Sequence, residues 1–359
     1  MIAWRAFMIT DSQALFEWKL RAIAQPAGRT VLDLEADSMH RHHEKLCLIQ
    51  YADEQGVAII DPLAIEDMRL FAVWLENAEV WMHGADYDMN LLQRAFGTLP
   101  RLILDTQIAA RLLGFRQFGL AALVEHFFGV TLSKKNQKAD WGLRPMSADM
   151  QEYAQGDVKY MLSMADILVE RLKKAGRYDW FIESCELQMQ KGRDRYLAGN
   201  CDPWRIKGAG NLEARGLAAL RELWNWRNEE AALWDRPAFM VCSNDELIHW
   251  SYALQEFRSI YPPHHFHAHR AARFRRAVEH FQLLDESDYP QPPKRTRHET
   301  DPEFEARLEH WQKRRNAISE ALNLEPCIIA TRSQLESIAN DYERGMQHLM
   351  LWQRKLLNN

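Results

Sequence analysis

Apolar residues change their spacing halfway along this 359-residue chain, so its two halves must fold differently. Short alternating or continuous apolar runs predict strands at Thr30–Glu35, Leu46–Tyr51, Val57–Ile60 and Val80–His83, with a short extended piece at Leu102–Leu104. Helical spacing covers Asp11–Ile23, Ile65–Glu76, Asp86–Phe96, Thr106–Leu113, Gly119–Phe128 and Ala148–Lys173. From about Glu186 onward, apolar residues recur only at helical spacing. This order predicts an α/β fold with a mixed sheet covered by helices, followed by an all-α half.

The helical half contains a faint internal duplication. Trp226-Arg227-Asn228, Pro237 and Leu247 have counterparts in Arg314-Arg315-Asn316, Pro326 and Leu335, and the Asn-to-Leu separation is 19 in both copies. The segment from Tyr289 to Pro302 holds four prolines and a basic cluster, which is typical of an exposed linker. We therefore expect three domains, at residues 1–190, 205–285 and 300–359.

Composition excludes several classes of protein. The five cysteines lie far apart with no CxxC pair, so neither a zinc ribbon nor a disulfide framework is predicted, and a cytoplasmic location is expected. No apolar run reaches the roughly 18 residues of a membrane span, so no membrane association is expected. The net charge of -5 argues against adhesion to nucleic acid through bulk charge, although basic residues can still gather locally.

Two acids share one face of the first predicted strand. Side chains two residues apart in a strand point the same way, so Asp33 and Glu35 lie together while Leu32 and Leu34 enter the core. Adjacent carboxylates repel each other unless a cation joins them. Taken alone, such a pair is more typical of a solvated strand face than of a site.

Further residues extend this acidic set. Asp88 lies beyond an expected helix cap at Asp86 and would project from the strand end where the first two acids emerge. Tyr153 and Asp157, four residues apart on a predicted helix, face one direction, although each alone could be an ordinary helix residue. Together, four carboxylates without His or Cys favour Mg²⁺ or Mn²⁺, and two such ions can stabilise both the attacking and leaving oxygens of a phosphodiester.

Basic residues gather in two places. A loop before the helix of Tyr153 contains Lys134, Lys135, Lys138, Trp141 and Arg144. Lysine and arginine position a nucleic-acid backbone without reading its sequence, so this loop is a candidate substrate contact. A solvated loop with Trp141 packed inward fits the sequence equally well. In the helical half we expect a bundle whose core contains Leu220, Leu223 and Trp224, with a basic strip formed by Arg270, Arg273, Arg275 and Arg276.

The ordered acids resemble the three motifs of the DEDD superfamily of 3′→5′ exonucleases, in its tyrosine-bearing branch. These motifs are Asp33-x-Glu35, then HGADYD ending at Asp88, then Tyr153-x-x-x-Asp157. Intervening stretches such as LIQYADEQGVAIIDPL and LILDTQIAARLLG resemble the ribonuclease D family. The duplicated units resemble the helicase-and-RNase-D C-terminal (HRDC) domain, strongly at 205–285 and in degenerate form at 300–359.

This resemblance implies a ribonuclease H-like exonuclease core at residues 1–190. Asp33, Glu35, Asp88 and Asp157 would ligate two divalent ions, Mg²⁺ or Mn²⁺, and Tyr153 would orient the attacking water. The implied reaction is hydrolysis of RNA from its 3′ end with release of 5′-mononucleotides. Precursors of tRNA or other structured RNA 3′ ends would be the substrates, and no protein partner is predicted.

One departure from the family and one ambiguous acid accompany the resemblance. Ala36 stands where many family members place an aromatic residue or a threonine. Asp105 matches a family position, but we interpret it as a structural cap of the helix that begins at Thr106. Two alternative functions remain, a DNA exonuclease of the same superfamily and a non-catalytic nucleic-acid-binding scaffold. The presence of all four acids and the tyrosine disfavours the scaffold.

Overall fold

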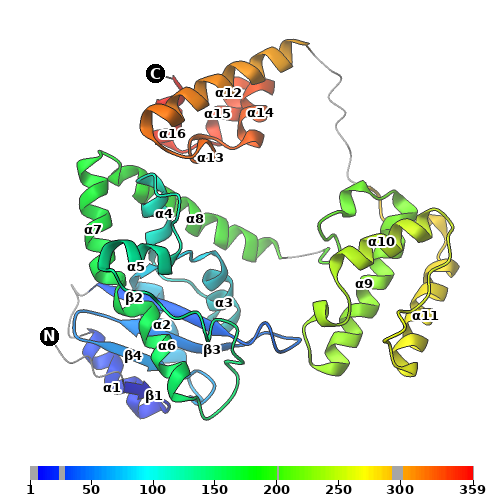
Figure 1. Ribbon diagram of the computed structural model, residues 1–359, viewed down its shortest axis with the longest axis horizontal. Coiled ribbons are helices and arrows are strands. Elements are labelled where there is room, and N and C mark those ends of the chain that lie inside the picture. Colours follow the sequence, from blue (N-terminus) through cyan, green and yellow to red (C-terminus); the bar gives the residue numbers. More distant parts are fainter. Residues whose placement is uncertain (1–6, 24–28, 200–201, 293–301, 359) are drawn as a thin grey trace. The chain divides into compact units, whose positions relative to one another are not determined.

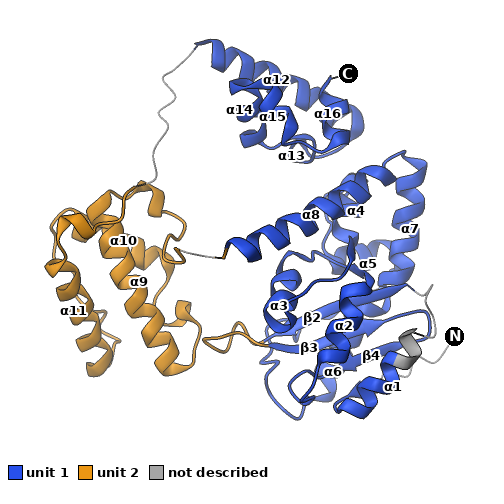
Figure 2. Cartoon of the chain, turned by 180° about the vertical axis from the view of Figure 1, so that it is seen from behind, with its two compact units in different colours: residues 1–36, 46–198, 298–359 blue, residues 37–45, 199–297 orange. Residues whose placement is uncertain are grey.

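The computed structural model describes residues 7–23, 29–199, 202–292 and 302–358 (Figure 1). One compact unit comprises residues 1–36, 46–198 and 298–359, and the other comprises residues 37–45 and 199–297 (Figure 2). We call these unit 1 and unit 2. No helix in the described ranges is long and apolar enough to cross a membrane.

A six-stranded mixed sheet forms the centre of unit 1. Its strands are β1 (Phe7–Ile9), β2 (Thr30–Ala36), β3 (Leu46–Ala52), β4 (Val57–Ile60), β5 (Glu79–Met82) and β6 (Leu102–Asp105), in the spatial order β1-β4-β3-β2-β5-β6. β2, β3 and β4 form an antiparallel meander. β5 runs parallel to both β2 and β6, and β1 runs parallel to β4. The predicted mixed sheet is confirmed. β1 was missed because three residues are too few to show a period.

The alternation of β2 places its two acids on the face opposite Leu32 and Leu34. Leu32 and Leu34 pack with one core cluster, which also contains residues of helices α1 (Ser12–Ile23), α2 (Arg69–Asn77) and α3 (Asp86–Phe96). Val31, on the opposite face, packs with helices α4 (Thr106–Leu112), α5 (Leu120–Phe128), α7 (Met161–Lys174) and α8 (Tyr178–Ala198). Asp33 and Glu35 share the face of Val31 because side chains alternate along a strand.

Two predicted helices have different bounds in the structure. The predicted helix over Ala148–Lys173 is two helices, α6 (Ala148–Lys159) and α7, which meet at Tyr160 with φ -98° and ψ -8°. The helix predicted from Ile65 begins at Arg69. Apolar spacing misplaced that start because Ile65 is buried, at 4% exposure, without being helical.

Unit 2 is a helical bundle, as predicted. Helices α9 (Ala214–Trp234), α10 (Asn244–Gln255) and α11 (Ala268–Leu283) surround a core that contains the fully buried Leu220 and Leu223. Residues 37–45, which connect β2 to β3, belong to this unit, and the backbone oxygen of His40 accepts a hydrogen bond from Arg236 at 2.9 Å.

The expected basic strip of unit 2 needs correction. Arg270 and Arg273 on α11 both bind the carboxylate of Glu230, whose side chain is only 2% exposed. One of their two positive charges is therefore neutralised within the unit. Arg275 and Arg276 are exposed.

The remaining helices complete unit 1. They are α12 (Pro302–Leu322), α13 (Pro326–Ile329), α14 (Arg332–Asn340), α15 (Tyr342–Gln347) and α16 (Leu351–Asn358). Trp352 stacks on Trp180 of α8, with ring centroids 4.7 Å apart and planes 11° apart. Gly114 has a φ of +86°, and a Cβ at this position would lie 2.5 Å from the backbone oxygen of Asn323. These helices therefore pack closely against the rest of unit 1.

The predicted duplication has structural counterparts. α9 and α12 both span 21 residues, and their first residues, Ala214 and Pro302, stand 88 positions apart. The same offset relates two capping boxes, Ser243 with Glu246 and Thr331 with Gln334. It also relates two arginine contacts, from Arg227 to the oxygen of Cys242 at 3.4 Å and from Arg315 to the oxygen of Ala330 at 3.3 Å.

Candidate metal centre

Three elements supply the predicted acids. Asp33 and Glu35 come from the central strand β2, and directly after them the pairing register with β3 shifts by one residue, from Glu35 with Leu48 to Ala36 with Leu46. Asp157 lies near the end of α6, and Asp88 lies in the first turn of α3.

Three of the four acids form a tight cluster. One carboxylate oxygen from each of Asp33, Glu35 and Asp157 lies within 4.8 Å of the other two, and all three residues are half-buried. A cluster built only from carboxylate oxygens fits hard divalent cations such as Mg²⁺ or Mn²⁺. The residues that the sequence separates by 124 positions thus meet at one point on the sheet.

Asp88 lies outside this closest group. Its side chain is 7% exposed, and its pKa is raised first by burial and then by the negative charges of Asp33 and Asp105. Its own charge in turn raises the pKa of Glu35. Asp88 therefore interacts electrostatically with the cluster, and its role as a shared ligand stays a prediction.

The acids hold their protons unusually firmly. Burial, followed by the charges of Asp33, Asp157 and Asp88, raises the pKa of Glu35 to about 10. Burial and the charge of Asp33 raise the pKa of Asp157 to about 8, and burial raises the pKa of Asp33 to about 6. Because the repulsion is mutual, a divalent cation that replaces these protons would stabilise the cluster.

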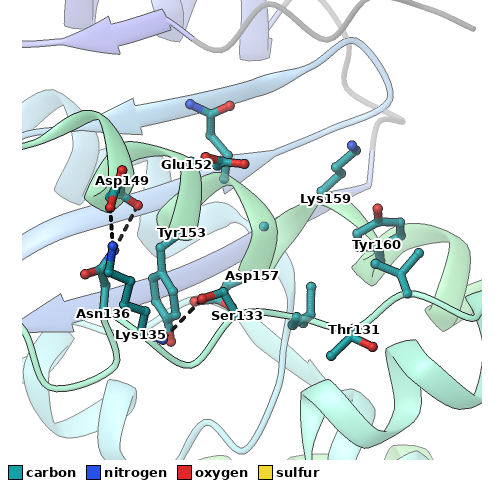
Figure 3. A pocket seen from close by; sticks show the side chains of 14 residues that line it. Thr131, Ser133, Lys135, Asn136, Asp149, Glu152, Tyr153, Asp157, Lys159 and Tyr160 are labelled. Atoms are coloured by element: carbon teal, nitrogen blue, oxygen red, sulfur yellow. Dashed lines mark hydrogen bonds and ion pairs between the residues drawn. The ribbon is translucent and has the colours of Figure 1, made fainter.

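Tyr153 is held against the cluster. Its ring points toward Asp157 in Figure 3, and its hydroxyl donates a hydrogen bond to that carboxylate. Burial and the surrounding negative charges raise the pKa of Tyr153 far above its usual range, so the hydroxyl stays protonated at neutral pH. Tyr153 can therefore donate a hydrogen bond but cannot act as a general base.

Gln50 is a site neighbour that the sequence analysis missed. It is fully buried on β3, pairs with Asp33 across the strands, and its Nε2 lies 3.5 Å from Glu35 Oε1. This contact lowers the pKa of Glu35, opposing the burial and repulsion that raise it. A polar residue within the otherwise apolar run LCLIQY was the available signal.

Asp105 caps α4, as predicted, and also braces the loop that leads to Asp88. Its fully buried carboxylate accepts a hydrogen bond from the backbone N–H of Gln107 at 2.8 Å. The same carboxylate accepts from the backbone N–H groups of Gly84 at 2.9 Å and Ala85 at 3.0 Å. The sequence predicted the cap of α4 but not the hydrogen bonds to Gly84 and Ala85, because about 20 residues separate Asp105 from these two residues.

Two residues of the expected substrate loop have structural roles instead. Trp141 is 1% exposed and packs against Tyr153, with ring centroids 5.9 Å apart. Arg144 forms a bidentate ion pair with the buried Asp61, at 2.6 and 2.7 Å, and donates to the backbone oxygen of Cys47. Trp141 is thus packed inward, as the alternative interpretation of this loop expects, whereas contact of the partly exposed Arg144 with substrate stays a prediction.

A pocket of about 560 Å³ opens beside Tyr153 and Asp157, between α6 and residues 130–136 (Figure 3). Two contacts to Asp149, in the first turn of α6, hold the loop in place. Lys135 Nζ lies 2.6 Å from its carboxylate, and Asn136 Nδ2 donates to its backbone oxygen at 2.9 Å. Lys134 and Lys138 are exposed in the same loop region, and their contact with substrate stays a prediction.

Sequence comparison relates the chain to nucleases. The profile of a family described as 3′-5′ exonuclease matches residues 6–173. Ribonuclease D of Haemophilus influenzae is 30% identical over 341 residues, which cover 92% of this chain and 84% of that protein. Ribonuclease D of Cronobacter turicensis is 34% identical over 244 residues, or 67% of this chain, but the match spans only 65% of that relative's length.

Comparison with solved structures agrees on the fold. The crystal structure of Escherichia coli RNase D, an exoribonuclease involved in structured RNA processing, matches with a TM-score of 0.72 and 27% identity. That match covers 94% of this chain and 90% of the other. The catalytic core of RRP6 from Trypanosoma brucei, at 23% identity and a TM-score of 0.62, shares the fold over 79% of this chain. The predicted fold class, a ribonuclease H-like exonuclease core followed by helical regions, is thus confirmed.

Proposed function

Because the chain belongs to the ribonuclease D family, we propose that it is a 3′→5′ exoribonuclease that removes nucleotides one at a time and releases 5′-mononucleotides. The observation that carries this proposal is the convergence of Asp33, Glu35 and Asp157 beside the hydroxyl of Tyr153. Phosphodiester hydrolysis by two divalent ions needs such a cluster of shared oxygen ligands.

The acids would act as metal ligands. We assign Asp33, Glu35, Asp88 and Asp157 to two divalent ions, Mg²⁺ or Mn²⁺. Such ions, when bound, activate water at neutral pH and stabilise the charge of the leaving oxygen. The carboxylates would release their protons on loading, which the raised pKa values of Glu35 and Asp157 make a measurable event.

Tyr153 would position the attacking water. Its neutral hydroxyl is fixed by Asp157 on one side and by packing against Trp141 on the other. A hydroxyl held in this way can orient a water molecule towards the scissile phosphorus without exchanging a proton with it. Asp105 would act indirectly, by fixing the loop from which Asp88 emerges.

The substrate would be RNA with a structured 3′ end, and we propose tRNA precursors as one class. Lys134 and Lys138 would contact phosphates near the cleaved end, and the exposed Arg275 and Arg276 of unit 2 would add phosphate contacts of their own. A cytoplasmic location and the absence of a protein partner stay predictions from the sequence.

We further propose the domain assignment made from the sequence: an exonuclease domain at 1–190, an HRDC domain at 205–285 and a degenerate HRDC-like domain at 300–359. The 88-residue offset between α9 and α12, with matching capping boxes and arginine contacts, supports a common origin for the two helical segments.

The proposal is tested with the purified chain and two 5′-labelled substrates, a 3′-extended tRNA and a single-stranded DNA of the same length. We expect the RNA to shorten by single nucleotides in Mg²⁺ or Mn²⁺, and no shortening in EDTA. Ca²⁺, which accepts looser coordination, should not support the reaction. Asp33→Asn, which keeps the shape of the side chain, is the control for contaminating nuclease.

Each outcome separates the alternatives. Faster degradation of the DNA would make the protein a DNA exonuclease. A folded chain that binds RNA but shortens neither substrate would make it a scaffold. Activity in EDTA, or in Asp33→Asn, would contradict the metal mechanism.

A further inference from the structure

Helix α8 packs against β6, α3 and α4, and it contacts the residues that hold the start of α3. Cys185, Gln188 and Gly192 share one face of α8, because they are spaced three and then four residues apart. The Sγ of Cys185 accepts a hydrogen bond from the backbone N–H of Asp105 at 3.5 Å, and Gln188 Nε2 donates to Asp105 Oδ2 at 3.2 Å. α8 therefore holds Asp105 by both its backbone and its carboxylate.

Gln188 carries a stability penalty that packing does not explain. The residue is half-buried, and its Oε1 is shielded from solvent with no hydrogen-bond partner among the residues that the structure describes. A buried acceptor without a partner destabilises a fold. A methionine has a similar shape and would fill the same space without this penalty. The reason for an amide here therefore lies in its hydrogen bond to Asp105.

Asp105 connects Gln188 to the first turn of α3. Its carboxylate accepts hydrogen bonds from the backbone N–H groups of Gly84 at 2.9 Å and Ala85 at 3.0 Å. Ala85 is the N-cap of α3, and Asp88 lies in the first turn of the same helix. A displaced Asp105 carboxylate would thus move the backbone from which Asp88 projects.

A second contact joins α8 to the residue that follows Asp88. Met89 is only 1% exposed, and a Cβ added at Gly192 would lie 3.0 Å from its Sδ. Glycine at this position lets the two helices approach closely. α8 therefore supports Asp88 at two places, through the loop before α3 and through α3 itself.

We propose that Gln188 is a positioning residue for the metal centre, which acts through Asp105 to hold the carboxylate of Asp88 where the ions bind. This inference rests on the proposed function, in which Asp88 is a metal ligand. Asp88 lies outside the tight cluster of the other three acids, so its share in metal binding depends on how firmly its helix is held. Residues beyond the ligands themselves tune metal affinity in this way.

The test is Gln188→Met in the full chain. This variant loses the donor to Asp105 but also the unpartnered oxygen, so the two effects on stability oppose each other and the Tm should stay within about 3 °C of wild type. The dissociation constant for Mn²⁺, measured by calorimetry without RNA, should increase by about three- to tenfold. The kcat should fall at low Mn²⁺ and recover at saturating Mn²⁺, where the KM for RNA should be unchanged.

A second variant and a control separate positioning from stability. Gln188→Asn leaves the amide one methylene short of Asp105, so it should weaken Mn²⁺ binding to a similar degree although it changes the packing differently. Gln190 is exposed on the same helix and donates to Asp194 at 2.7 Å. Gln190→Met should therefore leave the Mn²⁺ affinity and the kcat unchanged.

The route through Asp88 is tested in a second background. Asp88→Asn should itself weaken Mn²⁺ binding. Adding Gln188→Met to this variant should then change the dissociation constant by less than about twofold, because the ligand that Gln188 positions has already been impaired.

Three outcomes would overturn the inference. The first is unchanged Mn²⁺ affinity in Gln188→Met and Gln188→Asn. The second is a loss in the Asp88→Asn background as large as in the wild type, because Gln188 would then act by another route. The third is unchanged Mn²⁺ affinity in Asp88→Asn alone, which would also remove Asp88 from the proposed ligand set, whereas the first two leave the proposed function standing.

Discussion

Tyr153 and Asp157 lie one helical turn apart and share a hydrogen bond, yet substituting each of them should impair a different property of the enzyme. Tyr153→Phe removes only a hydroxyl, so we expect metal affinity to remain and the single-turnover rate to fall by about 10² to 10⁴. Asp157→Asn replaces a charged ligand by a neutral one, so metal affinity should fall and added Mn²⁺ should restore part of the activity. Metal titrations of both variants check this.

If Tyr153→Phe cleaves RNA at the wild-type rate, Tyr153 serves only as a packing partner of Trp141. Equal metal affinity in the two variants would remove Asp157 from the ligand set.

The acid cluster should make stability depend on pH and on metal together. Folded carboxylates with raised pKa values bind more protons than the unfolded chain does, so the stability of the metal-free protein falls as pH rises. With folded pKa values of about 6 for Asp33, about 8 for Asp157 and about 10 for Glu35, the loss should begin near pH 4, the ordinary pKa of carboxyl groups, and extend to about pH 10. Bound Mg²⁺ or Mn²⁺ opposes the same repulsion.

We therefore expect the Tm in EDTA to decline over this range and the Tm in Mg²⁺ to decline less. Glu35→Gln removes the carboxyl whose pKa is raised furthest and should therefore reduce the decline in EDTA. Parallel curves in EDTA and Mg²⁺ would mean that the metal does not bind at these acids.

The roles of residues that follow from local geometry could be predicted from the sequence. The roles that depend on partners far away in the sequence could not. Asp33 with Glu35 and Tyr153 with Asp157 follow from the periods of a strand and a helix. Trp141 and Arg144 were assigned to substrate because the loop is basic, whereas a distant acid, Asp61, determines the position of Arg144. Such a partner is visible only after folding.

Among the elements of unit 2, α9 and α11 are joined by a buried charge. Glu230, with a side chain 2% exposed, binds Arg270 and Arg273. Burial alone would raise its pKa, but the hydrogen bonds and charges of Arg273 and Arg270 lower it overall. This stabilisation is present above the pKa of the unfolded chain and is lost as pH falls through the lower folded value.

Glu230→Gln should therefore destabilise unit 2 by about 3 kcal/mol at pH 7, and by progressively less as acidic pH protonates the wild-type carboxylate. Urea unfolding over a series of pH values from neutral to acidic measures the difference. Glu256→Gln, which affects an exposed pair with Arg258 in the same unit, is the control and should cost under about 1 kcal/mol. If both substitutions lower the free energy of unfolding equally at pH 7, the buried pair contributes no more to stability than the control pair.

Among the secondary-structure elements, the antiparallel meander could be predicted because each of its strands carries its own apolar pattern. The break between α6 and α7 was not, because Tyr160 fits the apolar spacing of a continuous helix. The parallel pairing of β1 with β4 depends on the whole sheet and leaves no local pattern.

At the scale of the whole molecule, the last helices support the nuclease part. Trp352 is 4% exposed and stacks on Trp180, so Trp352→Ala should lower the free energy of unfolding by about 3 to 5 kcal/mol. The neighbouring Leu351 is 60% exposed, and Leu351→Ala should cost under about 1 kcal/mol. Denaturant unfolding of both variants measures the contrast, and similar losses would contradict the supporting role.

The interleaving of the two units has a consequence for synthesis on the ribosome. Arg111 and Glu325 form an ion pair 3.1 Å apart although 214 residues separate them, and unit 2 lies between them in the chain. Domains that emerge whole can fold during translation, but contacts this distant must wait for the later residues. The nascent chain therefore carries an unfinished nuclease surface, including Trp180, until residues 302–358 have been made. Chaperone dependence during translation should accordingly be greater for this protein than for one whose nuclease domain is continuous.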